Sequence, residues 1–161
     1  IDVWQRRGRN ADDGDARRQV TAHYALVDTR SPEFLRASLG DGWHQEESDP
    51  RTGERWQWTK GDAMVRLENP HAYPLVVECT LDGWSLGTER DLSVVSGTEA
   101  TEASVRVGTQ RARVLLAPVT VPPGISTLTL HSPQPPMAAG PGDSRSLGLC
   151  VFGLELAVRA K

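Results

Sequence analysis

The chain has 161 residues, enough for one domain with a hydrophobic core and an appendage but short for two domains. Its formal net charge is −3 and its pI is about 5.8, which argues against a nucleic-acid-binding surface because such domains are usually basic. The longest apolar run, Leu147 to Leu154, is far shorter than the roughly 18 residues that a membrane-spanning helix needs. Because the chain begins with Ile1 and shows no signal-peptide pattern, we expect a mature domain or a piece of a longer protein.

The first forty residues differ in composition from the rest of the chain. Residues 1–14 are charged and poor in apolar side chains, which predicts a linker. Asp15 is a suitable N-cap for a first short helix. A second helix is predicted to begin at Ser31-Pro32 and to end at Gly40, because serine caps helices and proline suits the first helical position. Residues 1–40 are therefore predicted to form a linker and a helical approach segment.

From Arg55 onward, apolar and polar residues alternate, which is the pattern of half-buried β-strands. Turn-forming residues separate about eight such segments, as in a β-sandwich or a jelly roll. The last of them, from about Leu147 to Arg159, is apolar on both faces, which is typical of a central strand. We therefore predict an all-β domain over residues 41–161, a jelly-roll-like sandwich of about eight antiparallel strands preceded by a short helical segment. The predicted strands lie near residues 56–58, 63–68, 75–81, 92–96, 103–107, 112–116, 127–131 and 147–159.

Two other features bear on the sandwich. Residues 133–144 form a long segment without strand pattern, and loops of this length are usually functional or disordered. Cys79 and Cys150 both fall in predicted strands. They fit either two buried thiols or a disulfide between neighbouring strands, depending on the redox compartment. Metal binding by two isolated cysteines is not expected.

Catalysis is the weaker interpretation of the polar residues. A glycoside hydrolase needs two carboxyl groups about 5–9 Å apart, whereas the adjacent Glu46 and Glu47 point to opposite sides of an extended chain. The sequence contains neither a serine-hydrolase elbow nor a zinc-binding helix motif. No cofactor is predicted, although Asp41, Asp49 or Asp62 together with backbone oxygens would suit a structural calcium ion.

Carbohydrate binding is the stronger interpretation. Sugar rings stack their apolar faces on tryptophan, while carboxylates and arginines bind the hydroxyl groups around the edge. Trp43 and Trp84 each follow an Asp-Gly pair that predicts a turn, so we expect both indoles to be exposed as stacking surfaces. Trp56 and Trp58 share one face of a predicted strand and are interpreted as core residues. The predicted hydroxyl-binding residues are Glu46, Glu47, Arg55 and Arg145.

Four short motifs carry a resemblance to a known group of proteins. They are Gly42-Trp43, the Arg-Trp-x-Trp run from Arg55 to Trp58, Asn69-Pro70, and the Asp-x-Arg-x-Leu-Gly run from Asp143 to Gly148. Over about residues 40–159, the chain resembles the β-sandwich domains of bacterial membrane-embedded, glycosyltransferase-type proteins of surface-polysaccharide assembly. The resemblance implies an extracytoplasmic jelly-roll domain, on the cell surface or the periplasmic side, of carbohydrate-binding type and without catalysis of its own.

The sequence thus favours a non-catalytic carbohydrate-binding or accessory module. Its expected partners are a glycan or polysaccharide and the larger membrane protein of which it would be a fragment. No nucleic-acid partner is expected. One alternative is a structural or protein-interaction domain that packs against a larger membrane enzyme and binds no sugar. A weaker alternative is a small glycan hydrolase that acts through Glu46 or Glu47.

Overall fold

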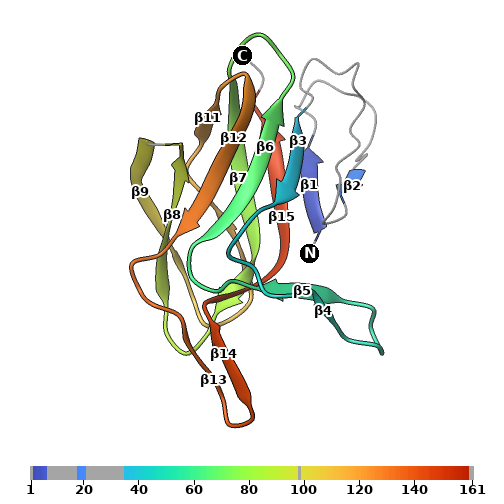
Figure 1. Cartoon of the computed structure of the whole chain (residues 1–161), viewed down its shortest axis with the longest axis vertical. Coiled ribbons are helices and arrows are strands. Elements are labelled where there is room, and N and C mark those ends of the chain that lie inside the picture. Colours follow the sequence, from blue (N-terminus) through green and yellow to red (C-terminus); the bar gives the residue numbers. More distant parts are fainter. Residues whose placement is uncertain (1, 7–17, 21–34, 98, 160–161) are drawn as a thin grey trace.

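The structure, a computed structural model, describes residues 2–6, 18–20, 35–97 and 99–159. Within these ranges the chain forms strands and no helix, so no described segment could cross a membrane as a helix. Two sheets pack face to face as a sandwich, and a separate hairpin projects from one end (Figure 1). The predicted all-β sandwich is therefore confirmed.

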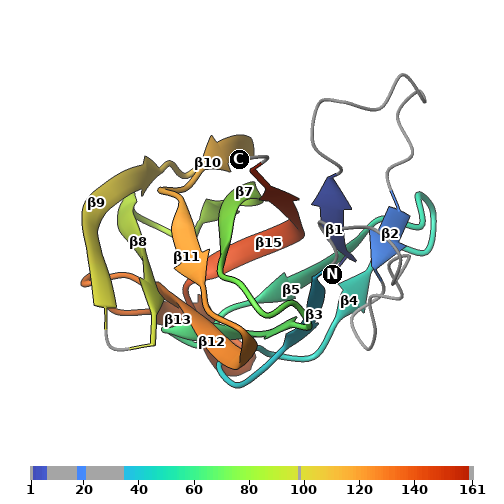
Figure 2. The ribbon, with the colours of Figure 1, turned by 90° about the horizontal axis from the view of Figure 1, so that it is seen from above.

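The larger sheet has eight strands, ordered β10-β7-β15-β1-β2, with β11 also paired to β7, β5 to β15 and β4 to β5. Its strands are β1 (Asp2–Arg6), β2 (Arg18–Val20), β4 (Glu47–Ser48), β5 (Arg55–Trp58), β7 (Leu75–Ser85), β10 (Ala112–Leu115), β11 (Val119–Val121) and β15 (Leu149–Val158). The smaller sheet is ordered β3-β6-β12-β8-β9. Its strands are β3 (Arg36–Leu39), β6 (Ala63–Asn69), β8 (Arg90–Ser96), β9 (Glu99–Val107) and β12 (Gly124–His131). The end view shows the two layers (Figure 2).

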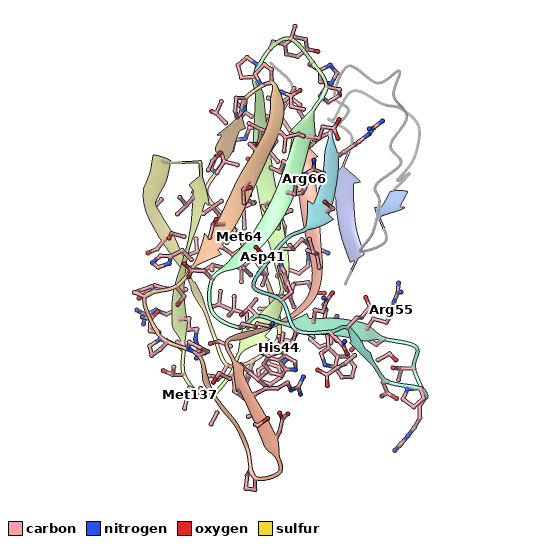
Figure 3. The ribbon with its side chains drawn as sticks, viewed as in Figure 1. Asp41, His44, Arg55, Met64, Arg66 and Met137 are labelled. Atoms are coloured by element: carbon pink, nitrogen blue, oxygen red, sulfur yellow. The ribbon has the colours of Figure 1, made fainter. Side chains whose placement is uncertain are left out.

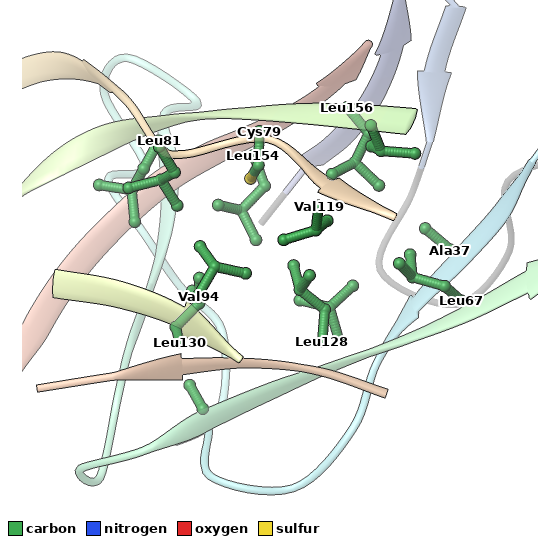
Figure 4. Close-up of a cluster of buried hydrophobic side chains, with 14 of the residues drawn as sticks. Ala37, Leu67, Cys79, Leu81, Val94, Val119, Leu128, Leu130, Leu154 and Leu156 are labelled. Carbon is green, nitrogen blue, oxygen red and sulfur yellow. The ribbon is translucent and has the colours of Figure 1, made fainter. Parts of the chain in front are cut away.

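The main core lies between the sheets and follows from the period-two pattern of the sequence. Buried and more exposed positions alternate along β6 and β7, so that alternate apolar side chains face the other sheet. Leu81 and Leu154 of the larger sheet pack in the same cluster as Leu128 and Leu130 of the smaller one (Figure 4). Burial of these side chains supplies the main driving force that holds the two layers together.

Strand β15 is central, as its sequence predicts. It pairs with β7 and β5 in antiparallel fashion and with β1 in parallel, which adds a parallel pair to the predicted antiparallel sandwich. Its residues Leu149 and Val151 face the main core, whereas Cys150 and Phe152 contribute to a second apolar cluster. This strand therefore has apolar neighbours on both of its faces.

The predicted helical approach segment is not found in the described part of the chain. Residues 36–39, predicted to be helical, form β3, which pairs with β6 and buries Ala37. Residues 18–20, predicted to lie in the first helix, form β2 beside β1. Pairing with a sheet edge and burial of alternate residues outweigh the local capping pattern there. Residues 7–17 and 21–34 lie outside the described residues, and a domain boundary at residue 40 stays a prediction.

The segment 133–144, predicted to be a structureless loop, contains most of a hairpin. Strands β13 (Met137–Gly140) and β14 (Asp143–Leu147) pair in antiparallel fashion and project from the sandwich (Figure 1). Gly140 and Gly142 at the tip have φ angles of 125° and 82°, which residues with a side chain rarely adopt. The turn therefore depends on glycine, and the apolar-polar alternation is too short to reveal the strands in the sequence.

Arg90 closes the end of the sandwich next to this hairpin. Its side chain is 1% exposed and donates hydrogen bonds to Ser85 Oγ and to the carbonyl oxygens of Leu86 and Pro135. Ser85 is the last residue of β7, Leu86 follows it, and Pro135 lies just before β13. The guanidinium thus joins segments that are far apart in the sequence through its two Nη atoms, whereas its buried Nε has no hydrogen-bond partner among the described residues.

Gly83 provides the first prediction, because β7 and β15 approach closely at this residue. A Cβ atom added there would lie 2.3 Å from the carbonyl oxygen of Cys150, which belongs to the backbone and cannot rotate away. We expect Gly83→Ala to lower the free energy of unfolding by about 1–3 kcal/mol, as overpacking does. Urea unfolding measures this change. Gly108→Ala is the control, since no atom lies within 4 Å of its added Cβ, and equal stability of the two variants would contradict the prediction.

Candidate functional site

The second apolar cluster lies on the outer face of the larger sheet, away from the main core. We call its four rings, Trp56, Trp58, Trp84 and Phe152, the outer aromatic cluster. Strand register aligns them, because Trp58 of β5 pairs with Cys150 of β15, which in turn pairs with Trp84 of β7. Directly paired residues share one face of a sheet. Leu147 of the β13–β14 hairpin also packs here, so the cluster extends from the sheet to the hairpin.

The rings of the cluster support one another. Trp58 and Trp84 meet edge to face, with ring centroids 5.1 Å apart and planes at 78°. The Trp56 and Phe152 centroids lie 6.0 Å apart. Trp58 is only 8% exposed, whereas Trp56, Trp84 and Phe152 are half-buried. Trp58 thus forms the buried base of the cluster, and the half-buried rings keep part of their surface open to solvent.

Arg111 forms one ionic edge of the cluster. Its Nε and Nη2 donate to the two carboxylate oxygens of Asp82, each at 3.0 Å, and its Nη1 donates to Glu54 at 2.9 Å. These hydrogen bonds raise the pKa of Arg111 above its ordinary value. The guanidinium carbon also lies 3.8 Å from the centroid of Phe152, a cation–π contact. Arg111 therefore covers one face of Phe152, which leaves the indoles as the more accessible rings.

Arg145 forms the other ionic edge of the cluster and links the β4–β5 hairpin to the β13–β14 hairpin. It donates to Asp143, with Nη2 2.7 Å from Oδ2, and to Glu47 of β4, with Nη1 3.3 Å from Oε2. The hydrogen bonds from Arg145 lower the pKa of Asp143 to about 2. His44, in the segment before β4, forms a second link because its Nε2 lies 2.9 Å from the carbonyl oxygen of Ser146. Figure 3 shows His44 where the two hairpins meet.

The structure brings together half of the predicted binding residues. Trp84, Glu47 and Arg145 lie at the outer aromatic cluster or at its edge. Trp43 does not, and its predicted exposure is wrong: the side chain is 9% exposed, belongs to the main core and donates from Nε1 to the carbonyl oxygen of Met64. The φ angle of 91° at Gly42 and its tight packing against the Asp62 backbone lead the chain inward here.

Glu46 and Arg55 form an ion pair at 3.4 Å, but on the other side of the β4–β5 hairpin. Because Glu47 pairs directly with Trp56, both face the cluster, and their chain neighbours Glu46 and Arg55 face away from it. Figure 3 shows Arg55 farther out along this hairpin than His44. Binding of a ligand by Glu46 and Arg55 stays a prediction. The two residues do not lie on the same surface as Trp84, Glu47 and Arg145.

Sequence reasoning missed several members of the site. Trp56 and Trp58 do share one face of a strand, as predicted, but that face points away from the main core. Phe152 lies in the last predicted strand, and the apolar character of both faces of that strand does not by itself indicate a surface cluster. Asp82, Glu54 and Arg111 carried no local pattern, because their contacts join residues 29 and 57 positions apart. A second apolar face on β15 was the one indication in the sequence that this side of the sheet would be covered.

Two of the carboxylates considered for calcium have hydrogen-bond partners within the protein. Asp62 contacts His131 Nδ1 at 2.8 Å, and Asp49 accepts a hydrogen bond from the backbone N–H of Arg51. Among the residues that the structure describes, no group of three or more His, Cys, Asp or Glu side chains is arranged to hold a metal ion.

Comparison with known proteins finds similarity in structure and not in sequence. No protein-family model matches the chain, and no curated protein matches it. Among solved structures, the chain is similar to the GH26-CBM35 β-(1,4)-mannanase of Podospora anserina (TM-score 0.48, 12% identity), with 80% of this chain covered. The chain spans 28% of the length of that mannanase. It is also similar to a ruminal GH26 endo-β-1,4-mannanase (TM-score 0.40, 7% identity), with 65% of this chain and 19% of that enzyme covered.

Two isolated modules are similar over most of their length. A family 35 carbohydrate binding module from an environmental isolate has a TM-score of 0.45 and 13% identity, covering 76% of this chain and 91% of that one. The CBM35 from Paenibacillus barcinonensis has a TM-score of 0.43 and 9% identity, covering 78% of this chain and 93% of that one. None of these similarities assigns a ligand to this chain.

The two cysteines provide a second prediction. Cys79 belongs to the main core and Cys150 to the second cluster, so they lie on opposite faces of one sheet and both thiols are free. The disulfide alternative is therefore wrong, and the alternative of two buried thiols is confirmed. Burial raises the pKa of each thiol to about 12. We expect iodoacetamide at about pH 8 to leave both unmodified in the folded protein and to label both after denaturation. Mass spectrometry measures this, and rapid labelling of the folded protein would contradict it.

Arg145 provides a third prediction, on the titration of Asp143. Removing the donor in Arg145→Gln should raise the pKa of Asp143 from about 2 towards its ordinary value near 4. Since the pKa is lowered in the folded state, the pair stabilises the fold above the ordinary pKa, and this contribution is lost as pH falls towards 2. NMR titration of the carboxyl carbon measures the shift. Arg113→Gln, which removes a partner of Glu155 instead, is the control. An unchanged Asp143 pKa in Arg145→Gln would contradict the assignment.

Proposed function

We propose that the chain is a non-catalytic carbohydrate-binding module whose ligand lies on the outer aromatic cluster. The observation that carries the proposal is the combination of two half-buried indoles, Trp56 and Trp84, with part-exposed carboxylates at the same surface. A sugar ring offers an apolar C–H face for stacking and hydroxyl groups for hydrogen bonds, and this surface offers both kinds of partner. The resemblance in the motifs 55–58 and 143–148 agrees with this proposal.

Each group has a distinct role in the proposed complex. Trp84 and Trp56 stack against sugar rings. Glu47 and Asp143 accept hydrogen bonds from sugar hydroxyls, with the carboxylates held in place by Arg145. Trp58 supports Trp84 from below through the edge-to-face contact. Because packing and ion pairs already hold these side chains, binding orders few additional rotamers, which favours affinity.

The electrostatics favour binding over hydrolysis. A glycosidase acid must hold a proton near neutral pH, which requires a raised pKa. Asp143 has a pKa lowered to about 2 by the hydrogen bonds from Arg145. This carboxylate is suited to accepting hydrogen bonds and not to donating a proton. We therefore propose that the module binds its glycan without hydrolysing it.

The setting of the module is part of the proposal as well. The motif resemblance supports an extracytoplasmic module attached to a larger bacterial membrane protein of glycosyltransferase type. In that setting, the module would bind polysaccharide close to the membrane enzyme that handles it. A protein-interaction domain is the alternative, and it would use the same apolar surface for a protein partner.

Glycan titration tests the proposal and provides the fourth prediction. We expect tryptophan fluorescence to change in a saturable way with at least one glycan of a linkage-diverse panel. Trp84→Ala and Trp56→Ala should each weaken that binding at least about tenfold, as the loss of a central aromatic contact does. Calorimetry confirms the affinities independently of the tryptophans, and circular dichroism confirms the fold of each variant.

Arg55→Gln is the matched control, because Arg55 lies on the other side of the hairpin from Trp56. It should leave the affinity unchanged. Failure of every glycan to bind, or full affinity in both tryptophan variants, would exclude binding at this surface. Loss of affinity in Arg55→Gln alone would place the ligand on the predicted Glu46–Arg55 side instead.

A further inference from the structure

We infer that the outer aromatic cluster selects glycans that are uncharged or positively charged and rejects acidic ones. This inference rests on the proposed function, because it concerns the ligand of the same surface. Its basis is the charge at the two ionic edges of the cluster, which we call the rim. The rim comprises two arginines and four carboxylates: Arg111, Arg145, Asp82, Glu54, Asp143 and Glu47. The carboxylates outnumber the guanidinium groups.

Both arginines of the rim already use the edge that would bind an acidic sugar. Carboxylates bind guanidinium best through two parallel hydrogen bonds from Nε and an Nη atom. In Arg111, Nε and Nη2 both donate to Asp82 at 3.0 Å. In Arg145, Nε and Nη2 both donate to Asp143, at 3.0 and 2.7 Å. A uronate would therefore have to displace a carboxylate of the protein from either arginine.

The third nitrogen of each arginine is also used. Nη1 of Arg111 donates to Glu54 at 2.9 Å, and Nη1 of Arg145 donates to Glu47 at 3.3 Å. Arg113 of β10, two residues after Arg111, donates to Glu155 at 2.6 Å. The arginines of the rim are thus held in ion pairs, and an incoming negative charge would meet carboxylates that exceed them in number.

The carboxylates, by contrast, keep the capacity to bind a ligand. Each ionised carboxylate has about four lone-pair positions, and the contacts to arginine occupy only part of them. The side chains of Glu47 and Asp143 are 36% and 35% exposed, so solvent and ligand can reach them. Acceptors of this kind suit hydroxyl and ammonium donors. The rim is therefore built to receive sugar hydroxyls or amino groups around rings that stack on Trp56 and Trp84.

The test compares neutral glucans with derivatives that carry a charged group, and it provides the fifth prediction. The β-1,4-linked series has three members. They are the neutral glucose oligosaccharide, the chitosan oligomer, which carries amino groups, and the C6-oxidised oligosaccharide, which carries carboxylates. Oligosaccharides of β-1,3-linked glucose are used in the neutral and C6-oxidised forms. Within each series, we expect the carboxylate form to bind at least about tenfold more weakly than the neutral one. The amino form should bind at least as tightly as the neutral form, and increasing salt from about 50 to 200 mM should weaken it.

A charge variant tests whether the rim causes the selection. The double substitution Asp82→Asn with Asp143→Asn keeps the side-chain shape and removes the negative charge and one of the two acceptor oxygens from the paired edge of each arginine. It should raise the affinity for the C6-carboxylate glucan relative to the neutral one at least about tenfold. Glu68→Gln is the matched control, since Glu68 pairs with Arg36 on the smaller sheet, and it should leave the ratio unchanged. Because the readout is a ratio of affinities in one protein, a moderate loss of stability does not affect it.

The outcomes separate the inference from the proposed function. Binding of neutral glucans with equal or tighter binding of the carboxylate forms would overturn the inference and leave the binding function standing. An unchanged ratio in the double variant would also overturn it, because the selection would then not come from the rim. Absence of binding by every form in both series, with no other glycan of the panel bound, would overturn both.

Discussion

The structure depends on one sheet that is apolar on both of its faces where β7 and β15 pair. One face of this pair closes the core of the sandwich, and the other carries the outer aromatic cluster. Since successive side chains in a strand alternate between faces, a single pairing register assigns each residue to one cluster or the other. Both the stability of the fold and the composition of the candidate site follow from that register. Gly83 matters for the same reason, because it allows the two backbones to approach as the register requires.

The periodic part of the sequence was sufficient to predict the sandwich. Strands such as β6 and β7 alternate strictly, and the apolar character of both faces of β15 identified a central strand. Local patterns failed where pairing decides the conformation. The Ser31-Pro32 start and the Gly40 stop suggest a helix, yet residues 36–39 join the edge of a sheet. The β13–β14 hairpin escaped prediction because its strands are short and have little alternation.

The candidate site was predictable in chemistry and only in part in position. An abundance of tryptophan, glutamate and arginine pointed to a sugar-binding surface, and Trp84, Glu47 and Arg145 do lie at one surface. The sequence could not show which indoles remain accessible, because this depends on the sheet face and not on the preceding Asp-Gly pair. Trp43 follows such a pair and is buried. The pairing of Arg145 with Glu47 joins residues 98 positions apart, and no local rule predicts such a contact.

The closure of the sandwich by Arg90 has a consequence for how this end of the fold responds to pH. A guanidinium group keeps its proton in acidic and in moderately alkaline water, even where burial lowers its pKa as it does for Arg90, whereas a histidine in its place would lose its proton as the pH rises through neutrality. The oxygens that it binds, from Ser85, Leu86 and Pro135, do not titrate either. This end of the molecule is thus held by hydrogen bonds whose donor and acceptors keep their protonation state when the pH changes.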